Sequence, residues 1–145
     1  MPETTSGKIT IEAPAARVQE ILFDIANYPS WSSAIKAVDV LSSDGQGRVT
    51  SAKITIDAGM MKDRVVLDYN WSNAPGRLDF SLSDADLLTE MDGAYIIVAD
   101  DDESTTVTYE LNVALSMPIP SMMRKKAEQT TIELALRQLK DHAEE

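Results

Sequence analysis

Apolar and polar residues alternate along much of the chain, and this period-two pattern predicts β-strands with one buried face. The clearest example is residues 107–115, where Val107, Tyr109, Leu111 and Val113 alternate with polar or small residues. Six further strands are predicted at residues 8–12, 38–42, 49–56, 65–71, 78–83 and 89–98. Short connections rich in Gly, Asn, Asp and Pro separate the strands from residue 38 onward, so we expect an antiparallel meander.

A different spacing marks the segment before this meander. Val18, Ile21, Leu22 and Ile25 recur at the period of an α-helix, with polar residues mostly on the other side. The helix is expected to end at Asn27, because the residue before a proline avoids the helical conformation.

A second, longer helix is predicted at residues 121–143, because this segment contains no glycine or proline and Ser121 can cap its start. On a helical wheel, the side expected to face the sheet carries Met123, Ala127, Thr131, Leu134, Ala135 and Leu139. The opposite side carries Lys126, Gln129, Glu133, Arg137 and Lys140.

The element order is therefore strand, helix, six strands and helix, which predicts an α+β fold. One curved antiparallel sheet is expected to wrap around the last helix, so that both elements bury their apolar faces. With 145 residues, the chain is long enough for one domain with a sizeable core and too short for two. We expect a single domain over residues 1–145, without a linker or an internal repeat.

The net charge of −11 and the sequence pI near 4.4 restrict the expected partners. Such an acidic surface repels phosphate backbones and anionic headgroups, which argues against nucleic-acid binding and stable membrane association. The N-terminus lacks the basic and apolar regions of a secretory signal. The longest strongly apolar stretch, residues 94–99, is far below the roughly 20 residues that span a bilayer. We expect a cytoplasmic protein, and its oligomeric state stays open.

Residues that support common catalytic and metal chemistry are scarce. The chain has no cysteine, which excludes disulfides and thiol catalysis. Its one histidine, His142, is expected at the solvated end of the last helix and not in a triad or metal site. The acidic run at residues 100–103 lacks the glycine of a calcium-binding loop and is expected to be a solvated turn. We expect no cofactor and no metal.

Residues 18–41 carry the most specific signature. They read VQEILFDIANYPSWSSAIKAVDVL, a helix followed by a Tyr-Pro-x-Trp step at residues 28–31 and a return strand. With the element order, this segment resembles the START/SRPBCC superfamily, and within it the polyketide cyclase/dehydrase branch that is also similar to coenzyme Q-binding proteins. The resemblance implies a helix-grip fold, β-α(-α)-β6-α, with a deep, mostly apolar cavity between the sheet and the C-terminal helix. Family members bind lipids, quinones, polyketides or steroid-like molecules there, and some catalyse cyclisation or dehydration.

Candidate ligand-binding residues are the side chains expected to face this cavity. On the strands they are Tyr69, Trp71, Phe80, Leu82, Tyr95, Tyr109 and Leu111. On the last helix they are Met123, Ala127, Thr131, Leu134 and Ala135. Tyrosine and tryptophan combine an apolar body with a polar tip, which suits an apolar pocket with few oriented polar groups. The alternative is that these residues only fill the core, and in this fold one face serves both purposes.

Three functional hypotheses remain open. The first is non-catalytic binding or carriage of a small hydrophobic molecule such as a lipid, a quinone or a polyketide-like compound. The second is a cyclase or dehydratase, which needs an inward carboxylate, such as Glu90 or Glu128, beside a tyrosine. Glu128 can instead form an i,i+4 ion pair with Arg124 or a polar point at the cavity mouth. The third is an interaction module with little cavity volume and an exposed apolar patch.

Methionines gather at two turns, as Met60 and Met61 and as Met117, Met122 and Met123. Flexible, polarizable side chains adapt to varied apolar surfaces, so these residues either form an entrance to the cavity or fill gaps in the core.

Overall fold

The computed structural model describes residues 4–57, 62–115 and 119–145. Its elements are β1 (Thr5–Ile11), α1 (Ala15–Phe23), a 3-10 helix η1 (Ile25–Ser30), β2 (Ile35–Ser43), β3 (Val49–Asp57), β4 (Lys62–Asn70), β5 (Arg77–Ala85), β6 (Leu88–Asp101), β7 (Ser104–Leu115) and α2 (Ser121–Ala143). The described residues do not include Met60, Met61 and Met117. The hypothesis that these methionines form an entrance to the cavity therefore stays a prediction.

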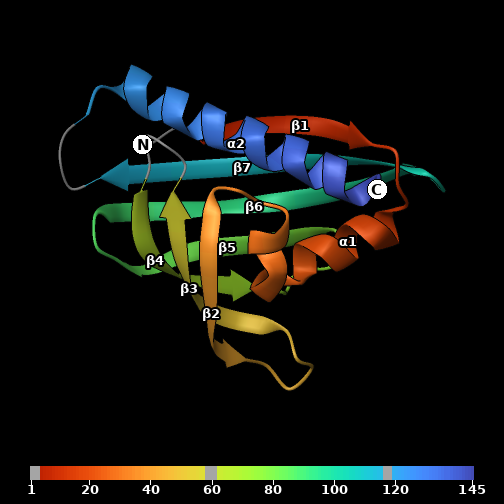
Figure 1. The fold of residues 1–145 in the computed structure, drawn as a ribbon, viewed down its shortest axis with the longest axis horizontal. Helices are drawn as coiled ribbons and strands as arrows, with labels where there is room; N and C mark the ends of the chain where they lie inside the picture. Colours follow the sequence, from red (N-terminus) through yellow and green to blue (C-terminus); the bar gives the residue numbers. More distant parts are fainter. Residues whose placement is uncertain (1–3, 58–61, 116–118) are drawn as a thin grey trace.

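The strands form one antiparallel sheet in the order β1-β7-β6-β5-β4-β3-β2. The predicted meander is confirmed, because each strand from β2 to β7 pairs with the next, while β1 pairs with β7. In Figure 1, β2 to β4 run across the direction of β6 and β7, so the sheet curves strongly. Register shifts in three of the strand pairs add local bends to the ordinary twist of the sheet. This is the predicted α+β helix-grip architecture.

Helix α2 lies along β1 and β7 (Figure 1). Its buried stripe consists of Glu128, Ile132, Leu136, Leu139 and Ala143. The side of α2 predicted to face the sheet is therefore rotated about the helix axis from the side that is buried. Leu139 belongs to both, whereas Met123 is 49% exposed. The prediction failed because a buried glutamate interrupts the apolar pattern of the stripe. Gly7 on β1 permits the close packing, since a Cβ at this residue would lie 2.8 Å from Cγ2 of Ile132.

The first helix ends before the predicted residue. Asp24 leaves the helical conformation (φ −90°, ψ 70°), and Ile25–Ser30 continue as a 3-10 helix. The Tyr28 hydroxyl donates a hydrogen bond to the carbonyl oxygen of Leu22. The Trp31 ring packs edge-on against Tyr28, with centroids 5.3 Å apart. These contacts turn the chain back beneath α1 and bury Tyr28.

Candidate functional site

An apolar pocket lies inside the curve of the sheet, between strands β3 to β7, the segment from η1 into β2, and α2. Its lining residues are Tyr28, Ser32, Ala34, Ile35, Ile54, Ile56, Leu67, Tyr69, Phe80, Met91, Tyr95, Tyr109, Thr131 and Ala135. The free volume is about 50 Å³, roughly a third of the ~150 Å³ that hold a benzene molecule. A guest larger than a few water molecules therefore requires the walls to move.

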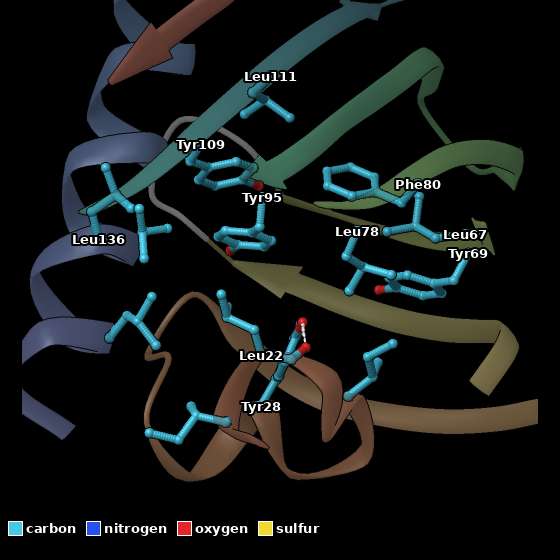
Figure 2. Packing of buried hydrophobic residues seen from close by; sticks show 14 of the residues in the cluster. Leu22, Tyr28, Leu67, Tyr69, Leu78, Phe80, Tyr95, Tyr109, Leu111 and Leu136 are labelled. Atoms are coloured by element: carbon cyan, nitrogen blue, oxygen red, sulfur yellow. Dashed lines mark hydrogen bonds between the residues drawn. The ribbon is translucent and has the colours of Figure 1, made fainter. Parts of the chain in front are cut away.

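Aromatic rings form most of one wall of this pocket. All four tyrosines of the chain line it. Tyr95 and Tyr109 are stacked, with centroids 4.3 Å apart and an interplanar angle of 21°. Phe80 packs at a tilt against Tyr69 (6.2 Å) and Tyr109 (6.3 Å). Figure 2 shows these rings on neighbouring strands, with Tyr28 facing them from the 3-10 helix.

Gly93 on β6 makes room for the Phe80 ring. Phe80 and Gly93 face each other in the β5–β6 pairing. A Cβ at residue 93 would lie 2.9 Å from Cζ of Phe80 and 2.2 Å from the carbonyl oxygen of Glu110. Backbone at that distance cannot yield, so any side chain here would displace this wall of the pocket.

The tyrosine hydroxyls are neutral hydrogen-bonding groups at physiological pH. Burial away from water raises the pKa of Tyr109 to about 12, because the charged form loses its hydration. The same effect raises the pKa of Tyr28, Tyr69 and Tyr95 well above the ordinary value. The pocket is therefore apolar and carries several hydroxyl groups. Among the described residues, its lining has no aspartate, glutamate, lysine, arginine or histidine.

Glu128 is buried, but its carboxylate faces the sheet and not the pocket. Thr5 Oγ1 donates to Oε1 at 2.6 Å, and the backbone N–H of Val113 donates to Oε2 at 2.7 Å. The anticipated contact with Arg124 is present at 3.9 Å, yet only 1% of Glu128 is exposed. Glu128 thus joins α2 to both β1 and β7.

Glu90, the other carboxylate proposed for acid–base chemistry, also lies outside the pocket. Its side chain is exposed on β6. Its Oε2 accepts a hydrogen bond of 3.4 Å from Asn112 Nδ2. Neither carboxylate is hydrogen-bonded to a tyrosine among the described residues.

A pair of hydrogen bonds links α2 to the segment that enters β2. The backbone N–H of Ser33 donates to Gln138 Oε1 at 3.0 Å, and Gln138 Nε2 donates to Ser33 Oγ at 2.8 Å. Ser32 and Ala34, on either side of Ser33, line the pocket, and so does Ala135, nearly one turn before Gln138. This Ser33–Gln138 clasp therefore holds together two elements that border the pocket.

Half of the predicted ligand-binding residues come together at the pocket. They are Tyr69, Phe80, Tyr95, Tyr109, Thr131 and Ala135. The other half lie outside its lining: Trp71, Leu82, Leu111, Met123, Ala127 and Leu134. Leu111 is fully buried in the core, and Met123 is largely at the surface. That any of the twelve contacts a ligand stays a prediction.

Trp71 shows why sharing a strand face with Tyr69 does not place a residue at the pocket. Its Nε1 donates to the carbonyl oxygen of Val49 at 2.7 Å. Its ring packs edge-on against Phe23 at 5.2 Å and lies 5.4 Å from the Arg48 guanidinium. These partners hold the tryptophan at the far end of β4.

The prediction missed eight lining residues. They are Tyr28, Ser32, Ala34, Ile35, Ile54, Ile56, Leu67 and Met91. Ile54, Ile56 and Leu67 share faces that the period-two pattern already assigns to the interior, so that pattern contained the signal. Tyr28 belongs to the Tyr-Pro-x-Trp step that carries the family resemblance. Ser32 and Ala34 lie in a connection, where no periodicity marks the inward side, and Ile35 is the first residue of β2.

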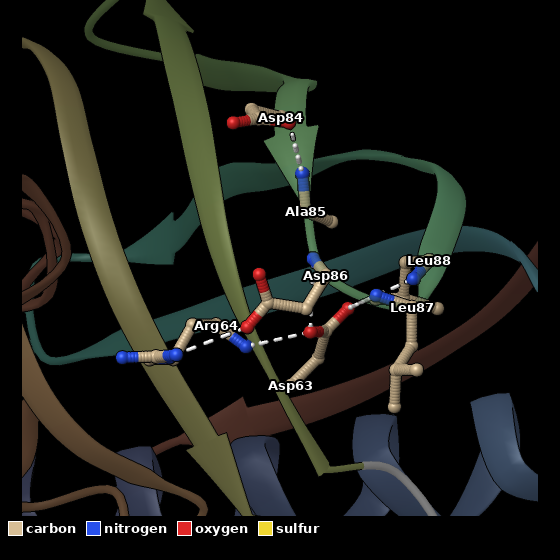
Figure 3. A network of polar contacts seen from close by, with 7 residues as sticks. All are labelled: Asp63, Arg64, Asp84, Ala85, Asp86, Leu87 and Leu88. Carbon is tan, nitrogen blue, oxygen red and sulfur yellow. Dashed lines mark hydrogen bonds and ion pairs between the residues drawn. The ribbon is translucent and has the colours of Figure 1, made fainter.

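Asp63 is a second buried carboxylate that patterning did not reveal. Its Oδ1 accepts backbone N–H bonds from Arg64 (2.8 Å) and Asp86 (3.2 Å), and its Oδ2 accepts them from Leu87 (3.0 Å) and Leu88 (2.8 Å). Figure 3 shows this network, together with the 3.3 Å contact between Arg64 and Asp86. The bonds fix the β5–β6 connection against the start of β4, and they occupy the carboxylate fully.

Within residues 4–57, 62–115 and 119–145, no group of three or more His, Cys, Asp or Glu side chains is arranged to hold a metal ion. No helix in the same described ranges is long and apolar enough to cross a bilayer.

Comparisons with known proteins agree with this architecture. The model of a family described as "Polyketide cyclase / dehydrase and lipid transport" matches residues 2–144. A START superfamily protein from Mycobacterium smegmatis has a similar structure, with a TM-score of 0.91, 23% identity and 97% of each chain covered. The Zhui aromatase/cyclase from Streptomyces sp. R1128 has a similar structure with a TM-score of 0.80 and 16% identity, and the match covers 99% of this chain and 94% of that one. A protein from Thermus thermophilus matches with a TM-score of 0.80 and 19% identity, and 97% of each chain is covered. At these identities the structural likeness shows the fold alone, and no curated protein matches the sequence.

Proposed function

Because the chain belongs to the polyketide cyclase/dehydrase and lipid-transport family, we propose that it binds a small hydrophobic molecule in the tyrosine-lined pocket and carries it without chemical change. The observation that carries this proposal is an inward apolar pocket whose lining residues bear no formal charge at neutral pH. Burial of apolar ligand surface supplies the binding free energy in such a site, and a few hydroxyls supply orientation.

The small free volume makes binding dependent on movement of the walls. The lining residues of α2, Thr131 and Ala135, are only half-buried, and the Ser33–Gln138 clasp beside them consists of exposed hydrogen bonds. Exposed hydrogen bonds are replaced by water at little cost. We therefore propose that a ligand enters between α2 and the segment from Ser32 to Ile35, with the clasp opening to admit it.

A cyclase or dehydratase is the second candidate. Tyrosine hydroxyls in an apolar site are suited to donate a proton or stabilise an oxyanion, which favours this alternative. A base is also needed to take a proton, and raised pKa values keep the four tyrosines protonated at neutral pH. Glu90 and Glu128 lie outside the pocket lining. These observations support binding as the first candidate.

The net charge of −11 supports a further part of the proposal, that the partner is the small ligand, without nucleic acid and without stable membrane association. We also propose that the protein acts in the cytoplasm.

A matched pair of substitutions on α2 tests the proposed site. Thr131 lines the pocket, whereas the adjacent Thr130 is exposed. We expect Thr131→Phe to fill the pocket and to abolish binding of hydrophobic compounds, and Thr130→Phe to leave affinity within about twofold of the original, because surface substitutions away from such features have small effects. The readout is native mass spectrometry of the purified proteins, followed by calorimetric titration with a panel of quinones, fatty acids and aromatic ketones.

The two variants separate the possible outcomes. Equal binding by both variants would show that the ligand lies elsewhere on the protein. Failure of the unsubstituted protein to bind any compound of the panel would contradict the proposal itself. Far-ultraviolet circular dichroism checks that each variant is folded. If the Thr131→Phe protein does not fold, Ala135→Phe provides a second pocket-filling change.

A further inference from the structure

The Tyr69 hydroxyl in the pocket is not used by the fold. The Tyr69 side chain is only 8% exposed, and its hydroxyl makes no hydrogen bond within the described parts of the chain. Among those same residues, Trp31 Nε1 is the one side-chain nitrogen or oxygen that is fully enclosed and has no hydrogen-bond partner. The Tyr69 hydroxyl is therefore not sealed within the packing. It borders the free space of the pocket, and Figure 2 shows it directed toward the middle of the cluster.

Tyr28 differs in this respect, because its hydroxyl donates to the Leu22 carbonyl oxygen. The rings of Tyr95 and Tyr109 are stacked on one another, whereas the Tyr69 ring contacts Phe80 only at a tilt. Tyr69 thus combines an unstacked ring with a buried hydroxyl that is available as a donor to a guest.

The surroundings of this donor decide which guest it suits. With no cation in the pocket lining, a carboxylate would lose its hydration without gaining a counter-charge, which is strongly unfavourable. A neutral carbonyl loses less hydration and recovers it through one hydrogen bond. The stacked and tilted rings of Tyr95, Tyr109 and Phe80 present flat apolar surfaces, against which another flat ring packs well.

We infer that the pocket selects a flat, uncharged ring compound that carries a carbonyl oxygen, and that the Tyr69 hydroxyl donates the hydrogen bond that recognises this oxygen. Carboxylate-bearing lipids such as fatty acids are excluded. This inference rests on the proposed function, because it concerns the same pocket. It makes Tyr69 a residue that determines specificity.

Three probes of nearly equal size separate the contributions. Ethylbenzene has no acceptor, acetophenone has a neutral carbonyl, and benzoate is an anion at pH 7. The affinity of each is measured by calorimetric titration for the unsubstituted protein and for Tyr69→Phe, which removes the hydroxyl and keeps the ring. Thr131→Phe and Ala135→Phe show whether the probes bind in the pocket.

We expect Tyr69→Phe to weaken acetophenone binding by about three- to tenfold, the value of one hydrogen bond, while ethylbenzene affinity stays within about twofold. Benzoate is expected to bind at least about 100-fold more weakly than acetophenone. Equal effects of Tyr69→Phe on both neutral probes, or benzoate binding as tight as acetophenone binding, would overturn the inference and leave the proposed function intact. Absence of binding by both neutral probes, or unchanged binding to the pocket-filling variants, would overturn both.

Discussion

Along one side of α2, the aliphatic side chains of Ile132, Leu136 and Leu139 are almost completely buried. Beside the neighbouring side of α2, which carries Thr131 and Ala135, the interior is lined by tyrosines and contains free space. The first region, which we call the packed half, is held by Glu128 and by the close approach of α2 to Gly7. The second, the open half, contains the pocket. Both regions belong to the inner face of the same curved sheet.

The difference between the halves shows how one small core serves both stability and binding. Unfilled volume costs about 24 cal/mol per Å³, so a pocket of about 50 Å³ lowers stability by only about 1 kcal/mol. The packed half can offset a loss of this size. The open half is then free to rearrange around a guest without loss of the fold.

The largest expected effect comes from breaking the packed half at Glu128. Glu128→Ala leaves the Thr5 hydroxyl and the Val113 N–H buried without an acceptor, and we expect it to lower the free energy of unfolding by about 3–5 kcal/mol. Glu133→Ala, on the exposed face of the same helix, is the control and should change stability by at most about 0.5 kcal/mol. Urea unfolding measures both, and equal small effects would show that Glu128 does not hold the helix in place.

Alkaline pH acts on the open half. The pKa of Tyr109 is about 12 in the folded protein and about 10 in an unfolded chain. Between these values the unfolded chain loses the proton and the folded protein keeps it. Stability is therefore unaffected below about pH 10 and falls as pH rises toward 12, by about 3 kcal/mol from Tyr109 alone.

Urea unfolding at a series of pH values, with tyrosinate absorbance followed in parallel, measures this loss. Tyr109→Phe should reduce the pH dependence. A tyrosinate titration of the folded protein that is complete near pH 10 would be inconsistent with tyrosines buried in the open half.

The smallest effect on stability is expected at the Ser33–Gln138 clasp, which joins the two halves beside the pocket. Gln138→Ala removes two exposed hydrogen bonds, so stability should fall by at most about 1 kcal/mol. Dissociation of a bound hydrophobic probe should nevertheless become faster, by about two- to tenfold, because one barrier to opening is lost. Stopped-flow fluorescence measures the dissociation rate. Gln129→Ala, at an exposed site on the same helix, is the control. Unchanged dissociation would place the entrance elsewhere.

The packed half and the open half also differ in how far the sequence predicts them. Alternation of apolar residues identified the strands, and it placed Tyr69, Phe80 and Tyr109 on inward faces, because the period of a strand is local information. The rotation of α2 was not predictable in the same way. Glu128 is buried because Thr5, which is 123 residues distant in the chain, donates to it, and such a partner is known only once the sheet has formed.

The irregular segment between η1 and β2 accounts for two of the eight pocket residues that the sequence did not predict, and five of the eight lie on strands. Ser32 and Ala34 have no periodic neighbours, and their inward direction follows from the 3-10 helix that ends at Ser30. Trp71 was placed with Tyr69 by strand alternation, but its hydrogen bond to Val49 and its contact with Arg48 fix it at the end of β4. Strand alternation predicts a face, and contacts between distant elements decide which part of that face is hollow.

Methyl-group NMR during addition of acetophenone offers a site-resolved test that a hydrophobic guest occupies the open half. We expect the methyl signals of Ile54, Leu67 and Met91, which line the pocket, to shift with a single saturable affinity. The exposed methyl groups of Leu41 and Met122 should not move. Shifts confined to those surface residues, or none at any concentration, would contradict an internal binding site.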